Sequence, residues 1–231
     1  MLEQLKKEVV LANQWLEKYD LVTFTWGNVS GFDPNSGNLV IKPSGVPYED
    51  LTIDNIVVVS LDGTVVEGSL KPSSDTPTHI ELYKAFPEVK GIVHTHSDWG
   101  TAWAQAGKGI PCAGTTQADY FFGEIPCTRR LTKEEVETDY EKCTGDVIIE
   151  TFKDINPIEV PGVVVHGHAP FAWGNSPASA LHNAVVLEKT AKMTFLSQQL
   201  AGTEKPEVLD DYVLNKHYQR KHGKNAYYGQ D

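Results

Sequence analysis

Apolar and polar positions follow two different periods along this chain, and the two periods predict a mixture of helices and strands. Apolar side chains recur at steps of three and four over residues 2–16, which is typical of one face of an amphipathic helix. Runs rich in β-branched or aromatic residues predict strands at 21–26, 38–42, 56–61 and 64–67. The Asp62-Gly63 pair between the last two runs predicts a hairpin.

Further helices are expected from Pro77 onward. One should begin at Pro77, because hydroxyl and carboxylate capping residues precede a proline that suits the first turn. Others are expected over 98–106, 133–140, 177–199 and 208–220, and residues 147–152 are expected to open a separate element. No low-complexity linker interrupts this mixture, so the pattern predicts one α/β domain spanning residues 1–231.

Composition and charge exclude several kinds of partner. The chain has 20 Lys and Arg against 31 Asp and Glu, a formal charge of −11, which opposes binding to nucleic acid or to an anionic membrane. It has no apolar run of about eighteen residues and no apolar core of a signal peptide near its start. The three cysteines show no CxxC spacing, which indicates a reducing, cytoplasmic setting. A small phosphorylated substrate stays compatible with the charge if local amides and a few placed cations bind it.

Two His-x-His pairs each end an apolar, strand-like run. They are His94 with His96 and His166 with His168. Side chains two positions apart on a strand share a face, so each pair can present two imidazoles to one cation. Three imidazoles at the end of a sheet match an open catalytic site that favours zinc, with manganese or cobalt as alternatives. The spacing leaves open whether His166, His168 or both join the first pair, and a purely structural role for one pair is the alternative.

Three small polar loops carry groups suited to an anion. They are Gly27-Asn28, Pro43-Ser44-Gly45 and Ser73-Ser74-Asp75. Backbone amides in such loops, and at the helix start after the third one, can reach a phosphate, while Asp75 can turn toward a cation. Ordinary turns and helix capping are the alternatives at each loop. The chain has no GxGxxG after its first strand, no P-loop and no GxSxG, so a dinucleotide, NTPase or serine hydrolase role has no support.

The order of these motifs is itself informative. Along the chain stand Trp26-Gly27-Asn28-Val29-Ser30, Lys42-Pro43-Ser44-Gly45, Lys71-Pro72-Ser73-Ser74-Asp75-Thr76, His94-Thr95-His96 and His166-Gly167-His168. In this order they resemble the class II aldolase/epimerase family. The resemblance continues through Gly114-Thr115-Thr116, Asp119-Tyr120, Lys216-His217-Tyr218, Arg220-Lys221-His222-Gly223 and the terminal Ala226-Tyr227-Tyr228-Gly229-Gln230. It therefore covers essentially the whole chain.

The resemblance implies roles that the spacing alone leaves open. The implied metal ligands are His94, His96 and His168, with Asp75 beside the metal. The implied substrate and phosphate contacts are Gly27, Asn28, Lys42, Ser44, Gly45, Ser73 and Ser74. Asp119 and Tyr228 are implied as the two acid/base groups, with the tyrosine supplied by a neighbouring subunit.

The resemblance also implies a fold and a reaction. The fold is a central, mostly antiparallel β-sheet flanked by α-helices in three layers, assembled as a homotetramer with sites at subunit interfaces. The reaction is epimerisation at C4 of a pentulose phosphate, through breaking and re-forming of the C3–C4 bond. Asp75, where the sugar-phosphate aldolases resemble one another in having Glu, and the tail Tyr-Tyr-Gly favour the epimerase branch. A departure is Gln117, which stands where such epimerases can have His.

Three rival functions remain. The nearest is a class II sugar-phosphate aldolase that releases its aldehyde product. The others are a non-catalytic scaffold on the same fold, which needs no histidine triad, and a structural zinc module, which needs a closed set of four ligands.

Overall fold

An antiparallel sheet forms the centre of the molecule. The computed structural model describes residues 2–203 and 207–228, and in this part seven strands pair in the order β4-β3-β2-β1-β5-β7-β6. The strands are β1 (Gly27–Asp33), β2 (Asn38–Ile41), β3 (Val57–Ser60), β4 (Val65–Glu67), β5 (Gly91–Thr95), β6 (Gly162–Val164) and β7 (Pro170–Gly174). Each of these strand pairs is antiparallel, as the family resemblance implied.

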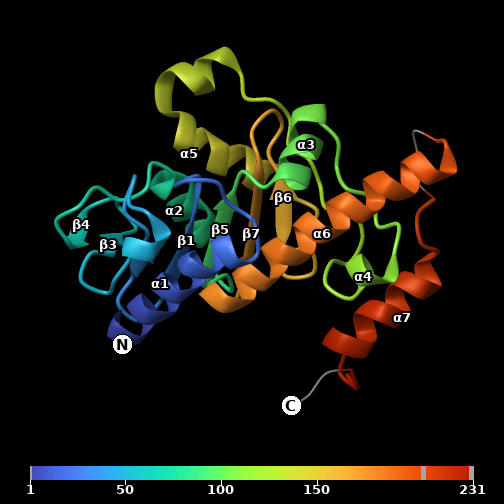
Figure 1. Ribbon diagram of the computed structural model, residues 1–231, viewed down its shortest axis with the longest axis horizontal. Coiled ribbons are helices and arrows are strands. Elements are labelled where there is room, and N and C mark those ends of the chain that lie inside the picture. The colour runs from blue at the N-terminus through green and yellow to red at the C-terminus, as the bar shows by residue number, and fades with distance from the viewer. Residues whose placement is uncertain (1, 204–206, 229–231) are drawn as a thin grey trace.

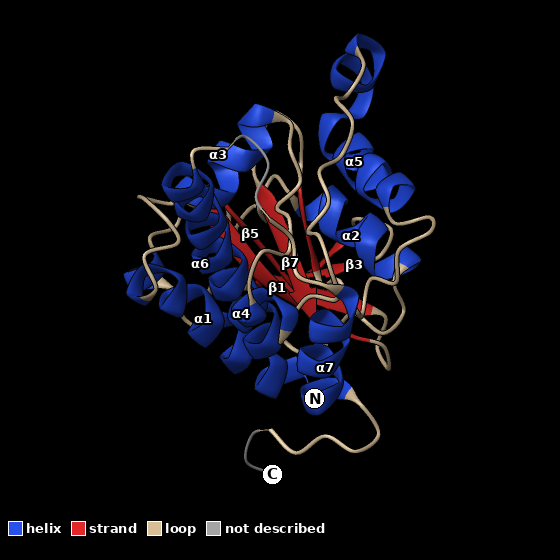
Figure 2. Ribbon diagram, turned by 90° about the vertical axis from the view of Figure 1, so that its right-hand side faces the viewer, coloured by secondary structure: helices blue, strands red, loops and turns tan. Residues whose placement is uncertain are grey.

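Helices cover both faces of this sheet and make a three-layer single domain. Figure 2 shows α1 (Leu2–Lys18) and α6 (Pro177–Ala201) on one side, and α2 (Thr76–Ala85) and α5 (Lys133–Thr151) on the other. The other helices in the described residues are η1 (Tyr48–Asp50), α3 (Asp98–Ala106), α4 (Thr115–Ala118) and α7 (Asp211–His222). None of the helices in residues 2–203 and 207–228 is long and apolar enough to cross a bilayer.

The strands bury side chains on both faces because residues along a strand alternate between them. On β2, Leu39 and Ile41 pack into the core below α2 and α5, while Val40 packs toward α1 and α6. The predicted amphipathic helix is confirmed, since Val9 and Leu16 of α1 are fully buried in that second core. The sheet is thus packed between two apolar cores, one on each face.

The strand predicted over residues 21–26 is wrong. These residues form a loop in which Phe24 has a φ of 53°, a left-handed conformation that ends any extended run. Strand β1 begins only at Gly27, which has a φ of 128°, and a Cβ there would lie 2.8 Å from the His94 carbonyl oxygen. The β-branched and aromatic composition suggested a strand, but Phe24 and Trp26 are 76% and 54% exposed in this loop.

The separate element predicted at 147–152 is also wrong, because these residues continue helix α5. Gly145 does not end the helix. A Cβ at this position would lie 2.9 Å from the Cβ of Glu81, so the glycine permits close packing of α5 on α2. The irregularity lies earlier, at Asp139, whose φ of −150° and ψ of 78° kink the helix.

Candidate active site

The polar loops predicted from the sequence meet around one cavity of about 540 Å³, which we call the histidine pocket. Its lining includes Gly27, Asn28, Lys42, Ser44, Gly45, Ser73, Ser74, Asp75, His94, His96 and His168. The structure therefore brings together all the residues predicted to hold a metal or to contact the substrate. Asp119 and Tyr228 do not line this pocket.

Strand pairing explains how distant segments converge there. In the β1–β5 register, Asn28 lies opposite His94. The two serine loops are joined by main-chain hydrogen bonds, in which the amide of Ser44 donates to the Lys71 carbonyl and the amide of Ser73 donates to the Lys42 carbonyl, both at 2.9 Å. The backbone itself thus places the loops side by side at the sheet end.

Three imidazoles form a compact set in this pocket. The ring centroids of His94, His96 and His168 lie 4.9–5.0 Å apart, and one nitrogen of each ring lies within 4.8 Å of the others. The Nδ1 atom of His94 is 3.0 Å from the Pro170 carbonyl oxygen, and as the donor in this hydrogen bond it leaves Nε2 free.

The pKa values of His96 and His168 suit metal binding. Burial, together with the neighbouring rings of His94 and His96, lowers the pKa of His168 to about 3, and burial lowers the pKa of His96 too. A metal binds only neutral imidazole, so a low pKa removes competition from protons. The donor set therefore fits a divalent cation.

The two histidines of the second His-x-His pair have different surroundings in the structure. The pair lies in a turn between β6 and β7, not on a strand, and Gly167 at its centre has a φ of 74°. The expectation that residues two apart on a strand share a face therefore does not apply to His166 and His168. His168 faces the other two histidines, whereas His166 Nε2 accepts a hydrogen bond from Nε of Arg130 at 3.0 Å.

Asp75 lies beside the three histidines but is not among the clustered donor atoms. Its Oδ2 atom accepts hydrogen bonds from Asn28 Nδ2 at 2.7 Å and from the Ser73 hydroxyl at 3.4 Å. Burial raises the pKa of the Asp75 carboxyl, but the nearby imidazoles of His94 and His79 and the Asn28 bond outweigh burial and hold this pKa below its usual value. A carboxylate so held adds negative charge next to the candidate cation site.

Two polar groups in the pocket are only partly satisfied by the described part of the chain. Lys42 is 2% exposed, and among the described residues its ammonium contacts the Pro43 carbonyl, at 3.3 Å, and the ring of Tyr48. Burial lowers the pKa of Lys42 to about 8. The Oδ1 atom of Asn28 is buried and has no hydrogen-bond partner in the described part of the chain. A buried donor cation and a buried free acceptor suit a ligand that carries both an anion and a hydroxyl.

The predicted acid/base residues lie together elsewhere. They belong to a group of five residues in mutual contact, which we call the Asp119 cluster: Asp119, His217, Arg220, His222 and Tyr228. It joins α4 and α7, which lie side by side at the right of Figure 1, away from α2 and β1. Burial raises the pKa of Asp119, but hydrogen bonds from Arg220 and His217 outweigh burial, so this pKa is lowered.

Gln117 has a structural explanation. Its side-chain amide donates to the carbonyls of Ile110 and Gly123, at 3.1 and 3.0 Å, and so ties together the loop that carries Asp119. Of the tail motif, Gly229 and Gln230 lie outside the described residues.

Sequence reasoning assigned no role to Tyr140 and Glu141, which line the pocket from the kinked part of α5. The Tyr140 hydroxyl is 3.3 Å from Nδ1 of His168. Burial raises the pKa of Tyr140. No local motif marks these residues, because the backbone at Asp139 that turns them inward follows no sequence pattern.

The chain is similar to known proteins along nearly its whole length. The family model described as the class II aldolase and adducin N-terminal domain matches residues 7–195. The L-ribulose-5-phosphate 4-epimerase UlaF of Salmonella paratyphi C is 56% identical over 229 residues, which cover 99% of this chain and 100% of that protein.

Solved structures share the fold. An L-fuculose 1-phosphate aldolase superposes with a TM-score of 0.78 at 23% identity, covering 94% of this chain and 95% of its own. YgbL of Klebsiella pneumoniae superposes with a TM-score of 0.70 at 26% identity, covering 92% and 97% of the two chains.

Proposed function

The chain belongs to the family of class II aldolase and adducin N-terminal domains, and on this premise we propose that it is an epimerase that interconverts L-ribulose 5-phosphate and D-xylulose 5-phosphate. The observation that carries the proposal is the histidine pocket. It combines three clustered imidazoles, a buried ammonium with no ion pair among the described residues, and two serine loops in one cavity.

Inversion at C4 cannot proceed by simple removal of the C4 hydrogen, because C4 is not next to the C2 carbonyl and this hydrogen is therefore not acidic. A carbon–carbon bond must break instead. Cleavage of C3–C4 yields glycolaldehyde phosphate and the enediolate of dihydroxyacetone, which keeps the electron pair of the broken bond. The aldehyde must stay bound while it turns its other face. Lys42, with the hydroxyls and amides of Ser44 and Ser73, holds the phosphate in this proposal. The free Oδ1 of Asn28 accepts a hydrogen bond from a substrate hydroxyl. These anchors keep the fragment from leaving, so that cleavage becomes epimerisation.

His94, His96 and His168 would hold one divalent cation, with Asp75 beside it. A bound cation would supply positive charge to stabilise the oxygen anions that form when C3–C4 breaks. We propose zinc, because imidazole donors favour it, with manganese or cobalt as alternatives. Tyr140 would orient His168 through its Nδ1 contact.

Inversion at C4 needs proton transfer on both faces of the aldehyde, hence two groups. Asp119 and Tyr228 take these roles in the proposal: one removes the C4 hydroxyl proton and the other returns a proton after the aldehyde turns. Neither lines the pocket of its own chain, so both would enter the pocket of a neighbouring subunit. This extends the expectation from the sequence, which placed only the tyrosine there, and fits a cytoplasmic homotetramer with shared sites.

A coupled assay tests the activity. Purified protein supplied with L-ribulose 5-phosphate should form D-xylulose 5-phosphate, lose activity with a chelator and recover it with zinc or manganese. Full activity in metal-free protein would contradict the metal role. Sustained release of dihydroxyacetone phosphate from L-fuculose 1-phosphate or L-rhamnulose 1-phosphate, without epimerisation of the pentulose phosphate, would identify an aldolase instead.

Mixed tetramers test the shared site. His96→Asn removes a pocket group and Asp119→Asn removes a cluster group, so each variant alone should be inactive. In randomly mixed tetramers at equal amounts, about one quarter of the sites should combine an intact pocket with an intact neighbouring cluster. Activity near one quarter of wild type supports sharing, whereas no recovery in verified mixed tetramers contradicts it.

A further inference from the structure

Arg220 contacts both residues to which the proposed function gives proton transfer. Its Nε atom donates to Asp119 Oδ1 at 3.1 Å and its Nη2 atom donates to Oδ2 at 2.8 Å, a bidentate pair. The two side chains are only 22% and 12% exposed. His217 Nδ1 lies 3.0 Å from the same Oδ1. The carboxylate of Asp119 is therefore held at both oxygens from helix α7.

Arg220 also holds the tail of the chain. Its backbone carbonyl accepts hydrogen bonds from the amides of Tyr227 and Tyr228, at 2.9 and 3.1 Å. The guanidinium carbon lies 4.4 Å from the centroid of the Tyr228 ring, a cation–π contact. Lys221 lies 5.7 Å from the same ring centroid. One residue thus fixes Tyr228 through its main chain and through its side chain.

Only arginine provides both contacts at once. The edge of the planar guanidinium carries the paired donors for a carboxylate, and its face remains available to stack on an aromatic ring. A lysine ammonium is a point charge that cannot bind two carboxylate oxygens in a fixed fork. The geometry therefore requires the chemistry of this side chain, and a positive charge alone does not reproduce it.

The opposite end of Asp119 is anchored as well. Its backbone carbonyl oxygen lies 2.8 Å from His222 Nε2, and the Tyr120 ring packs 3.4 Å from the Lys221 ammonium. These contacts attach α4 to α7 independently of the guanidinium. Loss of the Arg220 side chain should therefore loosen the carboxylate and the phenol without detaching the two helices.

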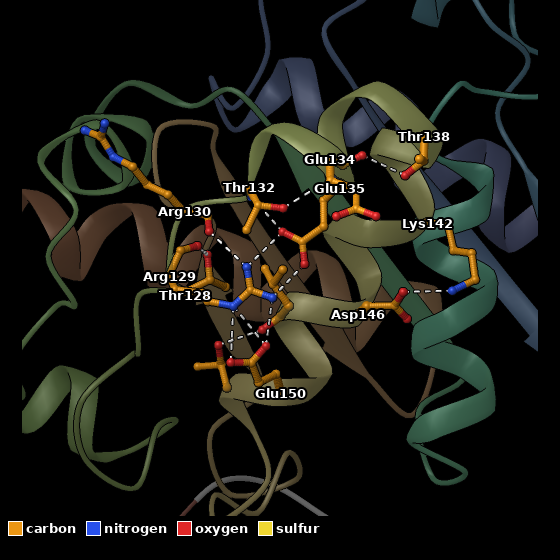
Figure 3. Close-up of polar contacts among 12 residues, drawn as sticks. Thr128, Arg129, Arg130, Thr132, Glu134, Glu135, Thr138, Lys142, Asp146 and Glu150 are labelled. Carbon is orange, nitrogen blue, oxygen red and sulfur yellow. Dashed lines mark hydrogen bonds and ion pairs between the residues drawn. The ribbon is translucent and has the colours of Figure 1, made fainter.

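Arg129 is a matched arginine that makes no contact, among the described residues, with a residue lining the histidine pocket or with the Asp119 cluster. Arg129 donates to both oxygens of Glu135, at 2.9 and 2.7 Å, and to Glu150 Oε2 at 3.0 Å (Figure 3). It is more exposed, at 41% of the side chain, and no aromatic ring of the described residues stacks on it. The pair with Glu135 stabilises the start of α5, where Thr132 forms a capping box.

Resting on the proposed function, we propose that Arg220 is a positioning residue that holds Asp119 and Tyr228 in a fixed mutual arrangement, so that both groups enter the neighbouring pocket as one unit. Its effect is on the chemical step. Substrate binding depends on Lys42 and the serine loops, which Arg220 does not contact. The arrangement also keeps the carboxylate ionised, ready to accept a proton.

The test compares Arg220→Met and Arg220→Lys with Arg129→Met in the full-length, metal-loaded protein. Both Arg220 variants should lower kcat by about 10²-fold with KM within about threefold of wild type, because a misplaced reacting group slows chemistry more than binding. Arg129→Met should keep both constants. Metal content, oligomeric mass and thermal unfolding serve as controls for structure in every variant.

A pH profile separates positioning from simple stability. The guanidinium favours the ionised carboxylate, so its removal should raise the pKa of Asp119 toward that of an ordinary aspartate. In the reaction direction in which Asp119 accepts the proton, the acidic limb of kcat should then move to higher pH in Arg220→Met. His217 and His222 still face Asp119 in this variant, and neither is removed.

The outcomes are distinct. If Arg220→Met keeps kcat within about twofold, or loses activity only in proportion to lost tetramer, the inference is wrong. If the methionine variant does not fold, the lysine variant decides, and Arg220→Ala with millimolar guanidinium added should regain kcat where methylammonium does not. Failure of the proposed function would instead appear as no epimerase activity in the wild-type protein.

Discussion

The histidine pocket and the Asp119 cluster differ in how far hydrogen bonds and ion pairs within one chain satisfy their polar atoms. In the pocket, the Lys42 ammonium has no ion pair and Asn28 Oδ1 has no partner in the described part of the chain. In the cluster, both oxygens of Asp119 are bound by Arg220, and His217 lies beside one of them. The pocket is thus incomplete until a ligand arrives, while the cluster is complete within one chain.

This difference assigns different physical tasks to the two regions. Buried groups without partners destabilise the folded state, and a ligand that satisfies them recovers that free energy as affinity. A fully bonded carboxylate stabilises the fold and has little freedom to move, which suits a group that must meet a substrate in one geometry. Binding and proton transfer are therefore expected to respond to different substitutions.

The largest effect should come from removing one imidazole of the pocket. His96→Asn should release most of the metal and lower kcat/KM by at least about 10³-fold, because the cation supplies several kcal/mol to the charged transition state. Metal analysis and the coupled assay measure this. His166→Asn is the matched control and should keep metal and activity, since His166 lies outside the set. Equal loss in both variants would contradict the selection of His168.

Asp119→Asn should affect the chemistry alone. We expect kcat to fall by about 10³-fold through loss of a proton-transfer group, with metal content unchanged because Asp119 does not line the pocket. Steady-state kinetics and metal analysis check both statements. Parallel loss of metal would show that the cluster supports the pocket of its own chain, and the separation of the two regions would be wrong.

Lys42→Met should change binding and stability in opposite directions. KM should rise by about 30-fold or more through loss of the phosphate cation. The free energy of unfolding should increase by about 1 kcal/mol, because an unpaired buried charge is removed. Chemical denaturation without substrate measures the second effect. Lys84→Met, at an exposed ion pair with Glu81, should leave both quantities nearly unchanged.

The sign of the pH dependence follows from the lowered pKa of Lys42. Folding disfavours its charged form, so the destabilisation is fully present below pH 8 and fades as pH rises from about 8 toward the ordinary value of 10.5. The stability difference between wild type and Lys42→Met should shrink over this range. A difference that stays constant from pH 7 to 10.5 would exclude the buried charge as its cause.

The smallest effect should come from Tyr140→Phe, which removes one hydroxyl contact to His168. Metal affinity should fall by about tenfold, as is usual when a group that orients a ligand is removed. A competition titration with a metal-binding dye measures the change. Unchanged affinity would mean that the turn around Gly167 orients His168 by itself.

Local pattern predicted most of the elements and most of the pocket. The period of apolar residues predicted α1, and turn residues predicted the hairpin between β3 and β4. The family resemblance, carried by the motifs, implied a mostly antiparallel sheet. The predicted strand at 21–26 and the predicted separate element at 147–152 were wrong. In the first case Phe24 adopts a left-handed backbone, and in the second Gly145 serves packing between α5 and α2.

The sequence by itself determined which chemical groups are present and which loops follow strands, because these depend on residue type and short-range spacing. Only the tertiary structure decided which groups meet. It placed His168, and not His166, beside His94 and His96 through the turn at Gly167, a choice that the spacing left open and the family resemblance implied. It also brought Tyr140 to the pocket through the kink at Asp139, and separated Asp119 from it. Arg220 and Asp119 are 101 positions apart. Such contacts depend on helix packing and strand register across the whole domain, and no local period carries that information.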